Sequence, residues 1–85
     1  MPRTNKEVTK YNKFIGQKIF LRRKEIGLTI AELAKEINVS TQQLYKYQIG
    51  ESIRAGRLVQ LAQVLMVKPS YFFEDIWNEI NDLKE

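Results

Sequence analysis

Cysteine and histidine are both absent from the 85-residue sequence. Without cysteine there are no disulfides, thiolate nucleophiles or cysteine metal sites, and without histidine the commonest general base and metal ligand are missing. No apolar run approaches the ~18 residues of a membrane span, and the polar start, Met1 to Lys6, has no hydrophobic signal core. We therefore expect a cytoplasmic protein that is not an enzyme, with no cofactor, no metal and no membrane partner.

The residues that are present suit one compact domain. The chain is 44% hydrophobic and 28% charged, which are ordinary values for a globular protein, and its length allows a single core. Charge is uneven along it: residues 1–24 hold eight Lys/Arg against one Glu, whereas residues 69–85 hold one Lys against five acids. This distribution indicates an anionic partner for one face of the molecule.

Apolar spacing along the chain predicts helices and no strands. A first helix is expected from about Tyr11 to a left-handed cap at Gly27, a fourth around Leu58 to Leu65, and a fifth after Pro69. Residues 1–10 are polar and lack periodicity, so they are expected to form a flexible basic arm. The predicted organisation is this arm, an all-α domain over 11–77, and an extension of the last helix over 78–85.

Two helix starts lie eleven residues apart in the middle of the chain. Thr29 is predicted to cap one helix with Glu32 as its capping-box partner, and Ser40 to cap the next with Gln43. The apolar residues placed as hydrophobic staples are Leu28 with Leu33 and Val39 with Leu44. One short helix, about Ile30–Ile37, and a tight turn fill the interval, which is the spacing of a helix-turn-helix.

The second helix of this pair has one polar face. Leu44 and Tyr47 are expected to face the core, and the opposite face carries Thr41, Gln42, Tyr45 and Lys46. Glutamine can bond to adenine N6 and N7, lysine to guanine O6 and N7, and the threonine methyl can touch a thymine methyl. The face is therefore suited to the DNA major groove, and the competing interpretation is a polar surface that only keeps the helix in water.

Residues from about Gly16 to Phe73 resemble the lambda-repressor-like (Xre, phage-repressor-type) helix-turn-helix regulators. The matching stretches are Ile15-Gly16-Gln17-Lys18-Ile19, Gly27-Leu28-Thr29, Ala31-Glu32-Leu33-Ala34, Val39-Ser40-Thr41-Gln42-Gln43-Leu44 and Leu61-Ala62, with Gly50 between them. The later run, Tyr45-Lys46-Tyr47, Ala55-Gly56-Arg57-Leu58 and Tyr71-Phe72-Phe73-Glu74-Asp75, is similar to an alphaproteobacterial branch. The resemblance covers about two thirds of the chain and implies a five-helix domain.

The resemblance also implies roles for individual residues. By it, the residues expected to read base edges are Thr41, Gln42, Gln43, Tyr45 and Lys46. Phosphate contacts are expected at Thr29, Ile30, Ser40, Arg54 and Arg57, partly through backbone N–H groups at helix starts.

Three positions depart from the family pattern. Ile30 stands where the family has a phosphate-binding glutamine, and Ile49 stands at a position that is often polar. Gln48 replaces a glutamate that pairs with the arginine at Arg23, so a neutral Arg23–Gln48 hydrogen bond is expected instead. These departures should weaken non-specific DNA affinity.

The last helix carries an apolar stripe. Its aromatic cluster, Tyr71, Phe72, Phe73 and Trp77, is expected in the core, and its acids, Glu74, Asp75, Glu79 and Asp82, on the solvent side. Ile76, Ile80 and Leu83 are predicted to contact a second copy, because repressors of this type bind two half-sites as two-fold dimers. Folding of the stripe back onto its own domain is the alternative.

The expected function is a sequence-specific, double-stranded DNA-binding transcriptional regulator. We expect a homodimeric, nucleoid-associated repressor that acts by occluding an inverted-repeat operator, with no small-molecule ligand. The alternative is a helical protein-interaction module or antitoxin-like partner with weak DNA binding, which Ile30 and Ile49 favour.

Overall fold

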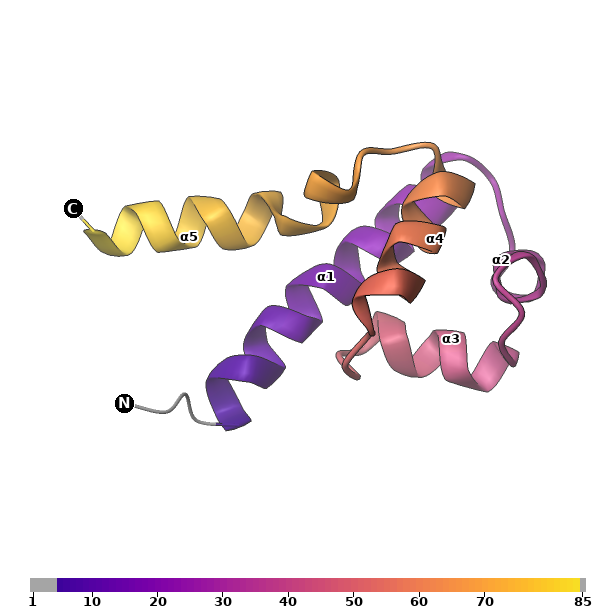
Figure 1. The fold of residues 1–85 in the computed structure, drawn as a ribbon, viewed down its shortest axis with the longest axis horizontal. Coiled ribbons are helices and arrows are strands. Elements are labelled where there is room, and N and C mark those ends of the chain that lie inside the picture. The colour runs from indigo at the N-terminus through magenta and orange to yellow at the C-terminus, as the bar shows by residue number, and fades with distance from the viewer. Residues whose placement is uncertain (1–4, 85) are drawn as a thin grey trace.

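The structure is a computed structural model that describes the backbone of residues 5–84 and the side chains of residues 8–81. Its elements, all helical, are α1 (Asn5–Glu25), α2 (Ile30–Glu36), α3 (Thr41–Gln48), α4 (Ala55–Leu65), the 3₁₀ turn η1 (Pro69–Phe73) and α5 (Glu74–Lys84). In Figure 1, α2, α3 and α4 gather at one end of the molecule and α5 runs toward the other. The predicted all-α, five-helix fold is confirmed.

The first helix begins at Asn5, six residues before the predicted start at Tyr11. Residues 5–10, which were expected in a flexible arm, are therefore helical, and residues 1–4 lie outside the described part of the chain. Lys10 forms an ion pair with Glu79 of α5, a residue far away in the sequence. Apolar periodicity carries no signal for such a contact, so the prediction began the helix six residues too late.

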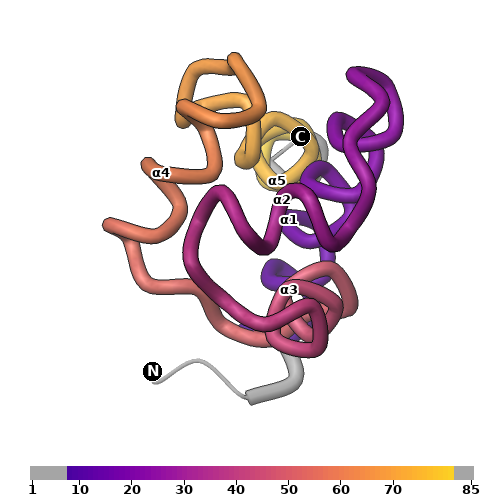
Figure 2. Tube along the Cα trace, turned by 90° about the vertical axis from the view of Figure 1, so that its right-hand side faces the viewer, coloured from indigo at the N-terminus to yellow at the C-terminus, as the bar shows by residue number. Residues whose placement is uncertain are grey.

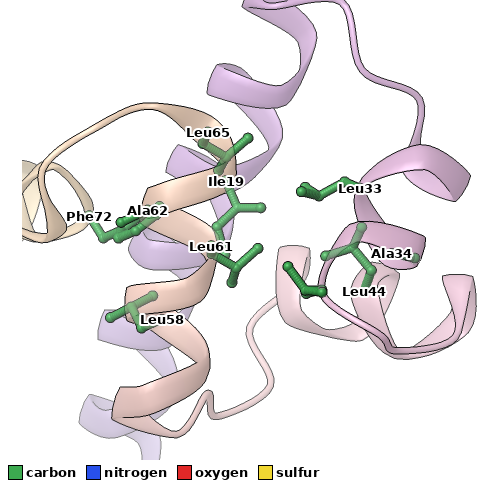
Figure 3. Packing of buried hydrophobic residues seen from close by; sticks show 10 residues of the cluster. Ile19, Leu33, Ala34, Leu44, Leu58, Leu61, Ala62, Leu65 and Phe72 are labelled. Atoms are coloured by element: carbon green, nitrogen blue, oxygen red, sulfur yellow. The ribbon is translucent and has the colours of Figure 1, made fainter.

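One hydrophobic core joins the four α-helices of the main body to η1. Its buried members are Ile19, Leu33, Ala34, Ile37, Leu44, Leu58, Leu61, Ala62, Leu65 and Phe72. Figure 3 shows these side chains meeting from helices that are far apart in the sequence. Because fully burying one large aliphatic side chain stabilises the fold by roughly 1.5–3 kcal/mol, this cluster fixes how α2 and α3 lie against α1 and α4.

Arginine side chains bond to carbonyls at two helix ends. Arg22 Nε donates to the Leu65 carbonyl, 2.9 Å away, at the end of α4, and Arg57 donates to the Ile37 carbonyl at the end of α2. The last carbonyls of a helix have no partner within the helix, so these bonds satisfy groups that would otherwise need water. They also tie α1 to α4, and α4 to α2.

The chain turns sharply between α4 and α5. Met66 ends α4 in the left-handed conformation with φ 57°, and Pro69 starts the tighter 3₁₀ turn instead of the predicted single helix. A 3₁₀ turn has about 3.0 residues per turn, so the face that continues into α5 is rotated from the predicted one. The aromatic cluster is accordingly split: Phe72 is fully buried, but Phe73 and Trp77 are 42% and 59% exposed.

The final helix packs against α1 at its start. Lys18 Nζ lies 3.5 Å from a Glu74 carboxylate oxygen and 4.3 Å from the centroid of the Tyr71 ring. Ile76, a predicted dimer contact, is buried within its own chain, since the start of α5 packs back on the domain. Ile80 is half-buried. The side chains of Leu83 and Asp82 lie outside the described residues.

The outer half of α5 makes the molecule elongated. Its radius of gyration is 13.2 Å and its longest dimension 40 Å, whereas a compact chain of this length has a radius near 12 Å. No described helix is both long enough and apolar enough to span a bilayer.

Candidate functional site

The second helix begins with a complete capping box. Thr29 Oγ1 accepts a hydrogen bond from the Glu32 N–H at 3.0 Å, and Glu32 Oε1 accepts one from the Thr29 N–H at 2.9 Å. The backbone N–H of Thr29, with help from its hydroxyl, holds the pKa of the Glu32 carboxyl below its usual value. The predicted start of α2 is thus confirmed, and one carboxylate and one hydroxyl set its position.

The third helix begins with half of the predicted box. Ser40 Oγ accepts a hydrogen bond from the Gln43 N–H at 3.0 Å, which confirms the cap. The return bond from the Gln43 side chain is not formed among the described residues. The turn between the two helices places Asn38 in the left-handed region with φ 57°, a conformation that asparagine tolerates better than most residues.

The outer face of α3 is arranged as the sequence predicts. Leu44 is fully buried and Tyr47 packs partly against the core. The four predicted surface residues, Thr41, Gln42, Tyr45 and Lys46, are all exposed. Figure 2 looks onto the end of the molecule formed by α2 and α3 and shows α3 at the surface there. A row of hydrogen-bonding side chains therefore stands on a helix whose other face is fixed in the core.

Close contact with α1 positions the C-terminal half of α3. A Cβ added at Gly16 would lie 2.4 Å from the carbonyl oxygens of both Tyr47 and Gln48, so only glycine permits this approach. Arg23 Nε donates to Gln48 Oε1 at 3.0 Å, which confirms the predicted neutral bond. The orientation of the exposed α3 face thus depends on a backbone-to-backbone contact with α1.

The two arginines predicted to bind phosphate are placed differently. Arg54 is the N-cap residue of α4, is exposed, and makes no side-chain cap bond. Arg57 is partly buried and bonds to the Ile37 carbonyl and, at 2.8 Å, to Gln60 Oε1. Both border a polar hollow of about 410 Å³ that Gln43 also lines, so the loop lies next to α3. Arg57 therefore also holds the end of α2 in place, a role that was not predicted from the sequence.

The start of α2 borders a smaller hollow of about 290 Å³, lined also by Arg23 and Lys24. At the starts of α2 and α3 the hydroxyl oxygens of Thr29 and Ser40 accept the cap bonds, so each hydroxyl can still donate its hydrogen to a phosphate, whereas the Thr29 N–H is already donated to Glu32 Oε1. Ile30 is half-buried against the core, and Ile49 is 53% exposed. The two departures from the family pattern therefore differ: one side chain packs inward and the other faces solvent.

Ion pairs neutralise only some of the cations among the described residues. The three ion pairs found among the described residues use Lys10, Lys18 and Arg22 as cations. Two of the carboxylates belong to α5. Lys13 and Arg23 share a hollow with Tyr45, Arg54 and Arg57 share another with Gln43, and Lys46 lies on α3 itself. Within the described residues none of these five cations pairs with an acid. Positive charge therefore remains uncompensated beside α3.

Sequence reasoning missed two features of this region. The tight contact at Gly16 shows in the sequence only as a glycine inside a predicted helix, which hints at close packing without naming the partner. The exposed Phe20, which lies beside Tyr45 and Ile49 at the α1–α3 seam, was assigned no role. A single helical pattern cannot show which side chains two helices bring together.

A family model described as Helix-turn-helix matches residues 19–72. The chain is 43% identical over 67 residues to an uncharacterized HTH-type transcriptional regulator of Sinorhizobium fredii, covering 78% of this chain and 47% of the relative. It is 43% identical over 77 residues to one of Rickettsia prowazekii, covering 89% and 59%, and 41% identical over 63 residues to a transcriptional regulator from the ATPase CF(0) region of Rhodospirillum rubrum, covering 73% and 58%. The chain spans about half the length of these curated relatives.

Proposed function

Since the matched model covers more than half of the chain, the chain belongs to the helix-turn-helix family of lambda-repressor-like (Xre) regulators, and we propose that it is a sequence-specific, double-stranded DNA-binding transcriptional regulator. The observation that carries this proposal is the exposed polar face of α3. The helix that carries this face is capped by Ser40 and held close to α1 at Gly16. The neighbouring cations pair with no acid among the described residues. Such a helix suits the major groove.

The proposal assigns base reading to the α3 face. Gln42 and Lys46 supply the side chains that distinguish adenine and guanine, Thr41 offers a methyl for thymine, and Tyr45 and Gln43 lie beside them. Phosphates are held at the start of α2 through Thr29 and Ile30, at Ser40, and by Arg54 in the loop before α4. Arg57 can bind phosphate only through those guanidinium N–H groups that do not already donate to the Ile37 carbonyl and Gln60 Oε1.

The finer proposal is a homodimeric repressor that occludes an inverted-repeat operator. One recognition helix touches only a few base pairs, and two helices ~34–36 Å apart would read successive major grooves on one side of the duplex. Support for a dimer comes from the end of η1 and from α5, where Phe73 and Trp77 are exposed and Ile80 is half-buried. These side chains take the place of the predicted contact Ile76, which is already buried.

The competing proposal is a helical interaction module, or an antitoxin-like partner, that binds DNA only weakly. The exposed Ile49 favours it, because an isoleucine cannot bind phosphate through its side chain. The two proposals differ in their dependence on salt. Each phosphate contact contributes about 0.9 to the slope of log K against log salt on duplex DNA, and an apolar protein interface contributes almost nothing.

A salt titration with random duplex DNA tests the proposal. We expect a steep negative slope, which Arg54→Ala reduces by about one unit without loss of stability. Arg57→Ala should also destabilise the fold, because it removes the bond to the Ile37 carbonyl. A wild-type slope near zero would favour the interaction module, and an unchanged slope in Arg54→Ala would remove that loop from the interface.

A further inference from the structure

An open groove of about 580 Å³ runs between α1 and α3 and ends at the start of α2. Its apolar walls are Phe20 from α1, Ile30 from α2, and Tyr45 and Ile49 from α3. The close approach of Gly16 to the carbonyls of Tyr47 and Gln48 holds α1 and α3 together at this seam. The groove volume falls within the ~300–1,000 Å³ that is usual for small-molecule sites.

The walls of the groove are unusually apolar for a surface beside a DNA-reading helix. Phe20 is 37% exposed and Ile49 is 53% exposed, although both could have been polar without disturbing the core. No other described segment of the chain covers them. An apolar concavity of this kind on a small protein marks a binding surface more often than a scattered single apolar residue does.

A cation without a counter-ion forms one wall of the same groove. Arg23 is partly buried, and its guanidinium bonds to Gln48 Oε1 at 3.0 Å and to the Leu28 carbonyl at 2.9 Å. Its Cζ lies 5.5 Å from the centroid of the Phe20 ring. All three partners are neutral, and none of the ion pairs among the described residues includes Arg23. The exposed Lys13 adds a second positive charge at the edge.

We infer that this groove binds a small organic carboxylate with an apolar body. The carboxylate would supply the negative charge that Gln48 lacks, since a guanidinium recognises a carboxylate through charge-assisted and often paired hydrogen bonds. The apolar body would cover Phe20, Tyr45 and Ile49. Neither part is sufficient alone, because an exposed ion pair contributes little and a shallow apolar surface gives no orientation.

The inferred site overlaps the proposed DNA interface. Tyr45 lies on the base-reading face and Ile30 at a proposed phosphate contact, so a carboxylate in the groove would compete with DNA; this consequence rests on the proposed function. The ligand site itself does not, because the apolar walls and the unpaired guanidinium are properties of the free protein. The inferred ligand departs from the expectation, made from the sequence, that the protein binds no small molecule.

The test is a titration of the full chain, without DNA, with decanoate below its micelle concentration, followed by NMR. We expect saturable shifts of the Arg23 side-chain Nε–H and of the Phe20 and Ile49 resonances. Acetate keeps the charge without the body and decanol keeps the body without the charge, and both should bind at least tenfold more weakly. Equal affinity for acetate, equal affinity for decanol, or no saturation by decanoate would overturn the inference.

Gln48→Glu is the decisive variant. The glutamate side chain has nearly the same shape as glutamine and places a carboxylate on Arg23 Nε. The variant should therefore keep or raise the thermal midpoint and bind decanoate at least tenfold more weakly. Unchanged decanoate affinity in a folded Gln48→Glu protein would overturn the inference. Decanoate should also weaken DNA binding by the wild-type protein. DNA affinity that is unchanged at saturating decanoate would overturn the inferred competition between decanoate and DNA. A wild type that never binds DNA would contradict the proposed function and leave the titration itself intact.

Discussion

In the α2–α3 unit the apolar side of each helix lies in the core, whereas in α5 the apolar side chains divide between the core and solvent. Leu33 and Leu44 are fully buried, and both helix starts are held by side-chain caps. Ile76 is buried too, but Trp77 beside it is 59% exposed. In the α2–α3 unit, the caps and the apolar positions predicted from the sequence agree with the burial in the structure. In α5 they agree only for the first turn, because Trp77 remains exposed and Ile80 is only half-buried.

The largest expected effect on stability comes from the contact between α1 and α3 at Gly16. Gly16→Ala forces a Cβ against two backbone carbonyls of α3 and should lower the free energy of unfolding by about 3 kcal/mol. The matched control is Gly56→Ala in α4, where nothing lies within 4 Å of the added Cβ; it should stabilise the protein by up to about 1 kcal/mol. Denaturant unfolding measures both, and similar effects of the two variants would mean that α1 does not seat α3 closely.

The second effect should spare stability and change association. Trp77→Lys, with Phe73→Lys, places charge on the exposed aromatic side chains of the proposed interface and should turn a micromolar dimer into a monomer with little change in thermal midpoint. The control, Val59→Lys, alters an exposed apolar residue of α4 and should leave the dimer intact. Sedimentation decides: a monomeric wild type, or a variant that remains dimeric, contradicts the proposed interface.

A smaller effect is expected at the cap of the recognition helix. Ser40→Ala removes the hydrogen bond to the Gln43 N–H and should cost about 1 kcal/mol of stability. Ser70→Ala, at an exposed position in η1, should cost almost nothing. Equal thermal midpoints for the two variants would show that the cap does not hold the start of α3.

The smallest effect depends on pH. The folded pKa of Glu32 lies below the unfolded value, so its contribution to stability is complete above about pH 4.5 and is lost as the pH falls through the folded pKa. Glu32→Gln should therefore narrow the difference in stability between pH 7 and pH 3. Thermal midpoints at the two pH values check this, and an unchanged difference would show that the capping box is weak in solution.

Much of the fold and of the α3 face could be predicted because the relevant signals are local. The caps at Thr29 and Ser40, the left-handed Gly27 and the exposed Lys46 follow from neighbouring residues and helical spacing. Other features depend on contacts between distant segments. The early start of α1 coincides with the ion pair of Lys10 with Glu79, and the task of Arg57 depends on the Ile37 carbonyl.

The end of the chain shows a third kind of limit. The sequence predicts one helix after Pro69, but the 3₁₀ turn rotates the stripe and exposes Phe73 and Trp77. Nothing in the apolar spacing alone distinguishes a 3₁₀ turn from the first turn of an α-helix. The groove beside Phe20 escaped prediction for a related reason, because it exists only where α1 and α3 meet.

The central claim is that the outer face of α3 reads DNA bases. The direct test selects bound fragments from genomic DNA and then compares Gln42→Ala and Lys46→Ala on the selected operator and on random duplex at one salt concentration. We predict that each variant loses about 1–3 kcal/mol on the operator and much less on random DNA, with relaxed base preference at the contacted position. Equal losses on both DNAs, or no selected sequence at all, would contradict the claim.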